Sequence, residues 1–115
     1  MRPEKVVQKQ LDAYNARDLD TYMSCFADDI IAVDFKTGET TLSGSTAFRE
    51  RYKEIFDNSP QIYCKLINRI TLSNLVFDRE EVTGRLGRDV FEVVAIYEVE
   101  HGLIQKVTFV KTADQ

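Results

Sequence analysis

The distribution of hydrophobic patterns along the 115 residues limits the possible folds more than any other feature. Apolar side chains recur at helical spacing only in the first half, whereas the second half consists of consecutive strand-like runs. These runs cover residues 61–72, 75–83, 89–100 and 103–112. Asn74 and the pair His101–Gly102 stand where tight turns should join them. Helices followed by a series of strands predict an α+β domain.

The first half predicts three helices and two strands. An apolar stripe predicts a helix over residues 3–16, and Asp18 can cap a short second helix. The apolar face of that second helix would carry Leu19, Tyr22, Met23 and Phe26 before it ends at Asp28 and Asp29. Residues 30–35 and 40–43 are typical of strands, and a third helix begins near residues 43–45 and stops at residues 58–60.

The third strand-like run, residues 89–100, carries apolar side chains on both of its faces. This pattern indicates a central strand that is covered on both sides. Together the elements predict one domain over residues 1–115, with the three helices on one face of a curved, mostly antiparallel sheet. A bent sheet that cups a helix leaves a cone-shaped, mostly apolar space where small ligands bind.

Charge and composition disfavour several classes of partner and cofactor. The net charge of −4 argues against nucleic acid and against anionic membrane surfaces. No apolar run approaches the roughly 18–20 residues that span a bilayer, and the charged N-terminus resembles no secretory signal, so we expect a cytoplasmic protein. With one histidine, no glycine-rich phosphate loop and two distant cysteines, Cys25 and Cys64, we expect free thiols and neither metal nor cofactor.

Three segments resemble the nuclear-transport-factor-2-like superfamily, in the subgroup of ketosteroid isomerase and the SnoaL-like proteins. Residues 6–29 are similar to the opening helices of that subgroup, residues 42–52 to the start of its third helix, and residues 91–109 to its final hairpin. The resemblance covers nearly the whole chain. It implies a cone-shaped cystatin-like fold and a cavity, but not one activity, because this fold carries enzymes and binding proteins alike.

The resemblance also implies a site in which a general base works with two oxyanion donors. The base position falls on Asp34, which would have a raised pKa if it were buried. The positions of the two donors fall on Gln10, whose amide can donate, and on Ala95, which can donate nothing. Loss of one such donor typically costs about 3–4 kcal/mol of transition-state stabilisation, so we do not expect efficient ketosteroid isomerisation.

Periodicity and the resemblance together predict the lining of the cavity. Besides Asp34 and Gln10, the expected lining residues are Tyr14, Tyr22, Phe26, Phe48, Tyr52, Phe91, Ala95 and Tyr97. Aromatic residues at such spacing are more often ordinary core, and an inward Gln10 is equally well explained by a structural hydrogen bond. Arg85 and Arg88 can meet an anionic ligand, although a solvated loop is the simpler interpretation, and His101 is expected in an exposed turn.

Two functional hypotheses remain open at this point. In the first, the protein is a cofactor-free isomerase or lyase that uses Asp34 as general base on a small apolar molecule. In the second, it is a non-catalytic binding or dimeric interaction module, which the missing acid at the position of Ala95 favours. If Asp34 is exposed to solvent, the first hypothesis fails. A homodimer is expected through the outer face of the last strands, near Val94, Ile96, Val107 and Phe109, because the helices leave that face uncovered.

Overall fold

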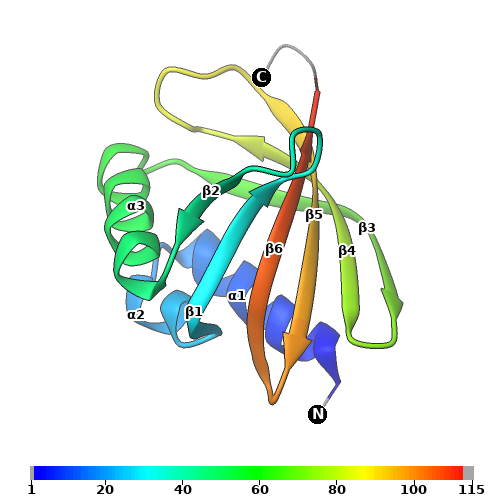
Figure 1. Ribbon diagram of the computed structural model, residues 1–115. Coiled ribbons are helices and arrows are strands. Elements are labelled where there is room, and N and C mark those ends of the chain that lie inside the picture. Colours follow the sequence, from blue (N-terminus) through cyan, green and yellow to red (C-terminus); the bar gives the residue numbers. More distant parts are fainter. Residues whose placement is uncertain (1, 113–115) are drawn as a thin grey trace.

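The computed structural model describes residues 2–112 and contains three helices and six strands among them (Figure 1). The helices are α1 (Pro3–Ala16), α2 (Leu19–Met23) and α3 (Ser45–Asn58). The strands are β1 (Phe26–Asp34), β2 (Thr40–Ser43), β3 (Tyr63–Leu72), β4 (Leu75–Thr83), β5 (Phe91–Glu100) and β6 (Leu103–Lys111). These bounds confirm the predicted α+β fold class and the predicted order of elements.

The six strands form one curved, mixed sheet in the order β2-β1-β6-β5-β4-β3. Every neighbouring pair is antiparallel except β1 and β6, which run parallel. His101 and Gly102 both have positive φ, at 53° and 74°, which is the backbone that a tight two-residue hairpin turn needs. The exposed turn predicted for His101 is therefore confirmed.

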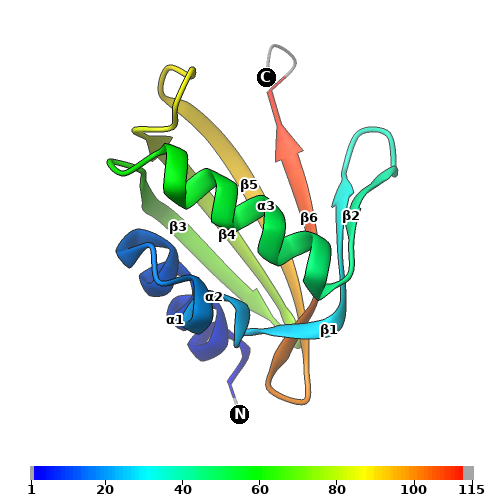
Figure 2. The same cartoon turned by 90° about the vertical axis from the view of Figure 1, so that its left-hand side faces the viewer.

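All three helices lie on the concave face of the sheet (Figure 2). Pro3 occupies the first turn of α1, where its missing N–H is not needed, and Arg17 ends the helix in the left-handed conformation. The buried stripe of α1 includes Val7 and Leu11, which pack into the main core. Each such side chain contributes about 1.5–3 kcal/mol through burial, so α1 is held to the sheet mainly by its apolar face.

The short second helix ends earlier than its sequence pattern predicts. Phe26 belongs to β1 rather than to α2, and Asp28 and Asp29 are exposed residues inside β1 instead of a helix end. The pairing of β1 with β6 is irregular between Phe26 and Ile31, and this interruption leaves the two aspartates in solvent. Tertiary pairing with β6, which local sequence cannot reveal, thus replaces the last turn of the predicted helix.

The outer face of the sheet differs in part from the predicted dimer surface. Val94 and Ile96 are half-buried on this face, as expected. Val107 is buried in the core and Phe109 faces the concave side, so neither belongs to the outer surface. An irregularity in the pairing of β5 with β6, at Glu98, shifts the alternation of β6 and turns both residues inward. Among the described residues, no helix is long and apolar enough to cross a bilayer.

Candidate active site

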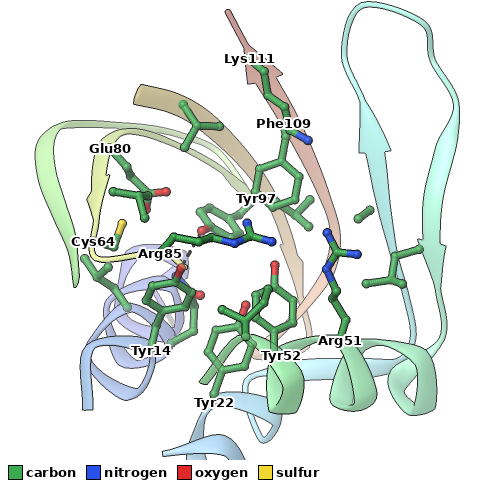
Figure 3. Close-up of a pocket in the computed structure, with 18 of the residues that line it drawn as sticks. Tyr14, Tyr22, Arg51, Tyr52, Cys64, Glu80, Arg85, Tyr97, Phe109 and Lys111 are labelled. Atoms are coloured by element: carbon green, nitrogen blue, oxygen red, sulfur yellow. Dashed lines mark hydrogen bonds between the residues drawn. The ribbon is translucent and has the colours of Figure 1, made fainter. Parts of the chain in front are cut away.

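A cavity of about 380 Å³ lies between the concave face of the sheet and the helices (Figure 3). Its size falls at the lower end of the roughly 300–1,000 Å³ that is typical of small-molecule sites. Aromatic rings make up much of its wall: Tyr14, Tyr22, Phe26, Tyr52, Phe91, Tyr97 and Phe109. Strands β1 to β6 and all three helices contribute to the lining, so the whole fold is needed to form it.

Glu80 is the carboxylate of this cavity. It lies on the inward face of β4 with Val76, Asp78 and Val82, and only 5 % of its surface is exposed. Burial, with a further contribution from the charge of Asp78, raises the pKa of Glu80 to about 8. A hydrogen bond from the Cys64 thiol and the nearby charge of Arg69 act in the opposite direction and are too weak to offset burial. The carboxyl is therefore mostly protonated at neutral pH.

A buried ion pair lies beside Glu80 on the same face of the sheet. Asp78 is fully buried and receives two hydrogen bonds from the Arg69 guanidinium, from Nε at 2.7 Å and from Nη2 at 2.9 Å. Nη1 of Arg69 donates to Gln8 on α1 at 2.8 Å. This two-point contact holds the Asp78 carboxylate in place, and its charge favours the protonated form of Glu80.

Tyr97 lines the cavity, and its hydroxyl group is hydrogen-bonded to the buried amide of Gln10. The Gln10 amide Nε2 donates to the Tyr97 hydroxyl oxygen at 3.2 Å and to the Val7 carbonyl at 3.3 Å. Because the hydroxyl oxygen already accepts a bond, its own proton remains available for a ligand. Burial raises the pKa of Tyr97 well above its ordinary value, so the group remains a neutral donor.

Three further tyrosines form a cluster across the cavity from β4. The ring centroids of Tyr22 and Tyr52 are 4.8 Å apart, and those of Tyr14 and Tyr22 are 6.0 Å apart. Burial raises the pKa of all three hydroxyls, which therefore stay protonated. The helices thus supply an apolar wall with neutral hydrogen-bonding tips, a surface that fits a planar or mostly apolar molecule.

Residues 7–107 match the family model of the SnoaL-like domain. The chain belongs to the SnoaL-like family. Of the solved structures similar to this SnoaL-like protein, an uncharacterised cystatin-fold protein from Novosphingobium aromaticivorans is 26% identical, with a TM-score of 0.88. That match covers 96% of this chain and 99% of the other. No curated protein matches the sequence.

Two other similar structures carry provisional functional names. A provisionally assigned ketosteroid isomerase from Kribbella flavida is 18% identical with a TM-score of 0.81, over 96% of this chain and 77% of that one. A provisionally assigned polyketide cyclase from Sinorhizobium meliloti is 17% identical with a TM-score of 0.78, over 91% and 93% of the two chains. At these identities the likeness shows the shared fold alone, and the family match confirms the resemblance drawn from the sequence.

Asp34, predicted as the general base of this SnoaL-like protein, does not line the cavity. Its carboxylate accepts hydrogen bonds from the Thr37 backbone N–H at 2.9 Å and from the Thr37 hydroxyl at 3.0 Å. These bonds lower the pKa of Asp34, opposite to the expected direction. The physical reason is the position of Asp34 as the last residue of β1, where its carboxylate caps the turn that follows the strand.

The other predicted site residues divide into cavity wall and core. Seven of them line the cavity: Gln10, Tyr14, Tyr22, Phe26, Tyr52, Phe91 and Tyr97. Phe48 and Ala95 are fully buried core residues that do not reach it. Phe48 packs its ring against Phe26, with centroids 5.6 Å apart, and Ala95 pairs with Asp78 in the middle of the sheet.

Several cavity residues were missed by the reasoning from sequence. Glu80 and Cys64 line the wall, and Arg51 and Lys111 join Arg85 and Arg88 around it. The signal for Glu80 was present in the alternation Val76–Asp78–Glu80–Val82, which places two carboxylates on one face of a strand. Cys25 and Cys64 are both free and buried. Within residues 2–112 no cluster of metal-ligating side chains is found.

Proposed function

We propose that this SnoaL-like protein binds a small, mostly apolar molecule in the cavity and moves a proton on it with Glu80, as a cofactor-free isomerase, cyclase or lyase. The observation that carries the proposal is a carboxyl group, 5 % exposed, inside a ligand-sized cavity. A buried carboxyl with no arginine or lysine bonded directly to it costs the fold stability, and such groups concentrate at acid–base sites. Glu80 takes the role that the sequence analysis assigned to Asp34.

The pKa of about 8 suits proton transfer in both directions near neutral pH. The ionised form of Glu80 accepts a proton from a carbon next to a carbonyl group, and the protonated form returns that proton to another atom of the same molecule. General acid–base catalysis is most efficient when the pKa of the group is close to the working pH, and it contributes roughly 10²–10⁴-fold. A step limited by the base should therefore accelerate as pH rises toward 8.

Tyr97 is the residue best placed to hold the charge that develops on the carbonyl oxygen. Its hydroxyl accepts a bond from Gln10, which fixes the oxygen and leaves the hydroxyl proton to donate into the cavity. In this proposal Gln10 is a positioning residue for Tyr97 rather than a direct oxyanion donor. Loss of one oxyanion donor lowers kcat by roughly 10²–10³-fold in well-studied cases, which sets the expected size of a Tyr97→Phe effect.

A general carbon acid can test the base before any natural substrate is known. We would measure turnover of 5-nitrobenzisoxazole, whose N–O bond breaks when a base removes the ring C–H proton, releasing a coloured phenolate. The wild type should exceed the buffer rate, and its rate should rise with pH to a plateau above about pH 8. Glu80→Gln should return the rate to the buffer level, and Asp34→Asn should retain the wild-type rate.

Equal rates for the wild type and Glu80→Gln would refute the catalytic role of Glu80. Loss of activity in Asp34→Asn alone would restore the original assignment of the base to Asp34. Tyr97→Phe separates a donor from a packing residue, because the ring is kept and only the hydroxyl is removed.

A non-catalytic binding module is the second candidate function. The observation in its favour is Ala95, which is fully buried at the position where the resemblance implies a hydrogen-bonding acid. Under this hypothesis the cavity binds a ligand, yet the wild type shows no turnover above the buffer rate of any carbon acid that binds. Binding and turnover of the same probe, measured on the same protein, therefore separate the two hypotheses.

A further inference from the structure

The residues around the cavity carry a charge opposite to that of the whole protein. The chain has a net charge of −4. The cavity lining nevertheless contains Arg51, Arg85, Arg88 and Lys111, with Glu80 as the single acidic residue. Arg51, Arg88 and Lys111 are exposed and Arg85 is half-buried, whereas Glu80 is buried. The positive charge therefore gathers at the mouth of the cavity, and the carboxyl lies deeper.

These four cations take part in none of the ion pairs found within residues 2–112. Other basic side chains do so: Arg49 pairs with Asp20, and Lys53 pairs with Asp57. Figure 3 shows the Arg85 side chain lying across the view of the cavity and the Arg51 side chain rising from α3 to one side of it. A half-buried guanidinium with no carboxylate beside it has given up part of its hydration without an ionic partner. The half-buried Arg85 and the exposed Arg51, neither of them in an ion pair among the described residues, together form a receptor for an anion.

The segment that carries Arg85 is anchored at several points. Gly84, with φ of +76°, lies so close to the Gln61 carbonyl that an added Cβ would be 2.1 Å from its oxygen. The Leu86 backbone N–H donates to the Ser59 hydroxyl at 2.9 Å. The Arg88 guanidinium lies over the Phe91 ring, 3.9 Å from its centroid, a cation–π contact that holds it at the mouth. Anchoring of this kind holds Arg85 in position in the unbound protein, which lowers the entropic cost of binding a ligand.

We infer that the ligand of this cavity is an amphipathic organic anion, whose carboxylate or similar head group binds Arg51 and Arg85 while its apolar body lies among the aromatic rings. The inference rests on the proposed function and adds the class and the orientation of the substrate. The anionic head lies at the mouth because the cationic partners are there, whereas the same group buried beside Glu80 would lose its hydration without one. The apolar body then reaches inward, which brings its carbon atoms to Glu80 and Tyr97.

Two fluorescent probes that share one apolar body can test this. 8-Anilinonaphthalene-1-sulfonate carries an anionic head, and N-phenyl-1-naphthylamine is its neutral counterpart. We would measure the Kd of both for the wild type, for the double variant Arg51→Gln/Arg85→Gln and for Arg49→Gln/Arg79→Gln. The last is a control with the same change in net charge: Arg49 stands on α3 and Arg79 on β4, and neither lines the cavity.

The wild type should bind the sulfonate more tightly than the neutral probe. The cavity double variant should weaken sulfonate binding by about tenfold or more, because two charge-assisted hydrogen bonds are lost, and should change the neutral probe less than about twofold. The control variant should behave as the wild type. Raising the NaCl concentration should weaken binding of the sulfonate alone, a measurement on the wild type that does not depend on the variants folding.

The remaining outcomes overturn one proposal or both. If the double variant weakens both probes equally, or the control weakens the sulfonate as much, the arginines do not recognise the anion. If the neutral probe binds the wild type and the sulfonate has no advantage, the anionic ligand class is wrong while the proposed cavity function stands. If neither probe binds the wild type, the cavity is not a binding site for such molecules and the proposed function fails with it.

Discussion

Replacing Glu80 by glutamine should change how the stability of the fold depends on pH. The folded-state pKa of Glu80 is raised from the ordinary 4.5 to about 8. Below pH 4.5 the carboxyl is protonated in the folded and the unfolded chain, and its titration costs nothing. Between pH 4.5 and 8 the unfolded chain loses the proton while the folded chain keeps it, so stability falls as pH rises. Above about pH 8 both forms are ionised and the loss is complete.

Each pH unit within this interval costs about 1.4 kcal/mol. The cumulative loss is therefore about 3 kcal/mol at pH 7 and approaches about 5 kcal/mol above pH 8. Glutamine keeps the shape and the acceptor oxygen and does not titrate. The free energy of unfolding of Glu80→Gln should exceed that of the wild type by a margin that grows across this interval. At pH 7 the difference corresponds to roughly 10 °C in Tm for a domain of this size.

The assay is urea unfolding of both proteins at half-unit steps from pH 4 to 9. Glu81→Gln, which removes a carboxyl from the opposite face of the same strand, supplies the background effect of one lost charge. The decisive quantity is the slope with pH, because any constant difference in packing between Glu and Gln cancels from it. A stability difference between the wild type and Glu80→Gln that stays constant from pH 4.5 to 8 would refute the reasoning.

Three further predictions concern the turn after β1, the arginine segment and the outer face of the sheet. Asp34→Asn should be less stable than the wild type at neutral pH, since the bonds from Thr37 lower the pKa of Asp34. The difference in stability should shrink as pH falls through the lowered pKa of Asp34. Equal melting curves of the two proteins at pH 7 would contradict this prediction. Gly84→Ala should destabilise the fold by roughly 2 kcal/mol or more, because the added carbon meets the Gln61 carbonyl and the backbone has positive φ; an unchanged Tm would count against this. The outer face around Ile96 supports the proposal of a homodimer, so Ile96→Lys should convert a dimer to a monomer in sedimentation velocity at micromolar concentration, whereas a monomeric wild type would remove the proposal.

The fold could be predicted from the sequence because its local and long-range signals agree. The apolar stripe of α1 and its terminal residues gave the observed bounds, Pro3–Ala16, and the strand-like runs of the second half gave the strands of the sheet. The end of α2 was wrong because Phe26 follows helical spacing and also suits a strand. Only its pairing with Ile104 on β6, far away in sequence, decides between the two.

The site was harder to predict for two physical reasons. Asp34 is the last residue of β1, where a carboxylate can either reach the cavity or cap the next turn, and the alternation of the sequence does not distinguish the two. Strand β4 carries apolar and charged residues on both faces. Arg79 and Glu81 lie on one face, and Asp78 and Glu80 lie on the other. Hydrophobicity alone therefore could not decide which pair of charges lies inside. The two interpretations of Gln10 both hold, because its amide donates a structural hydrogen bond to Tyr97 and its side chain also lines the cavity.

The position of β6 has a consequence for the order in which the molecule can assemble. β6 is the last strand along the described chain, yet it lies in the middle of the sheet, between β1 and β5. While the ribosome is still making residues 103–111, the β1–β2 hairpin and the β3–β4–β5 meander have no strand to join them. The polypeptide must therefore hold two unfinished half-sheets, each with an open edge, until its closing strand emerges. Helix α1 contacts β3 to β6 and helix α3 contacts β1 and β2, so the packed helices can bring the halves near each other but cannot supply their missing hydrogen bonds. Folding should consequently be a late, concerted event dominated by contacts distant in sequence, and a nascent chain stalled before Leu103 should be a better client for chaperones than the finished protein.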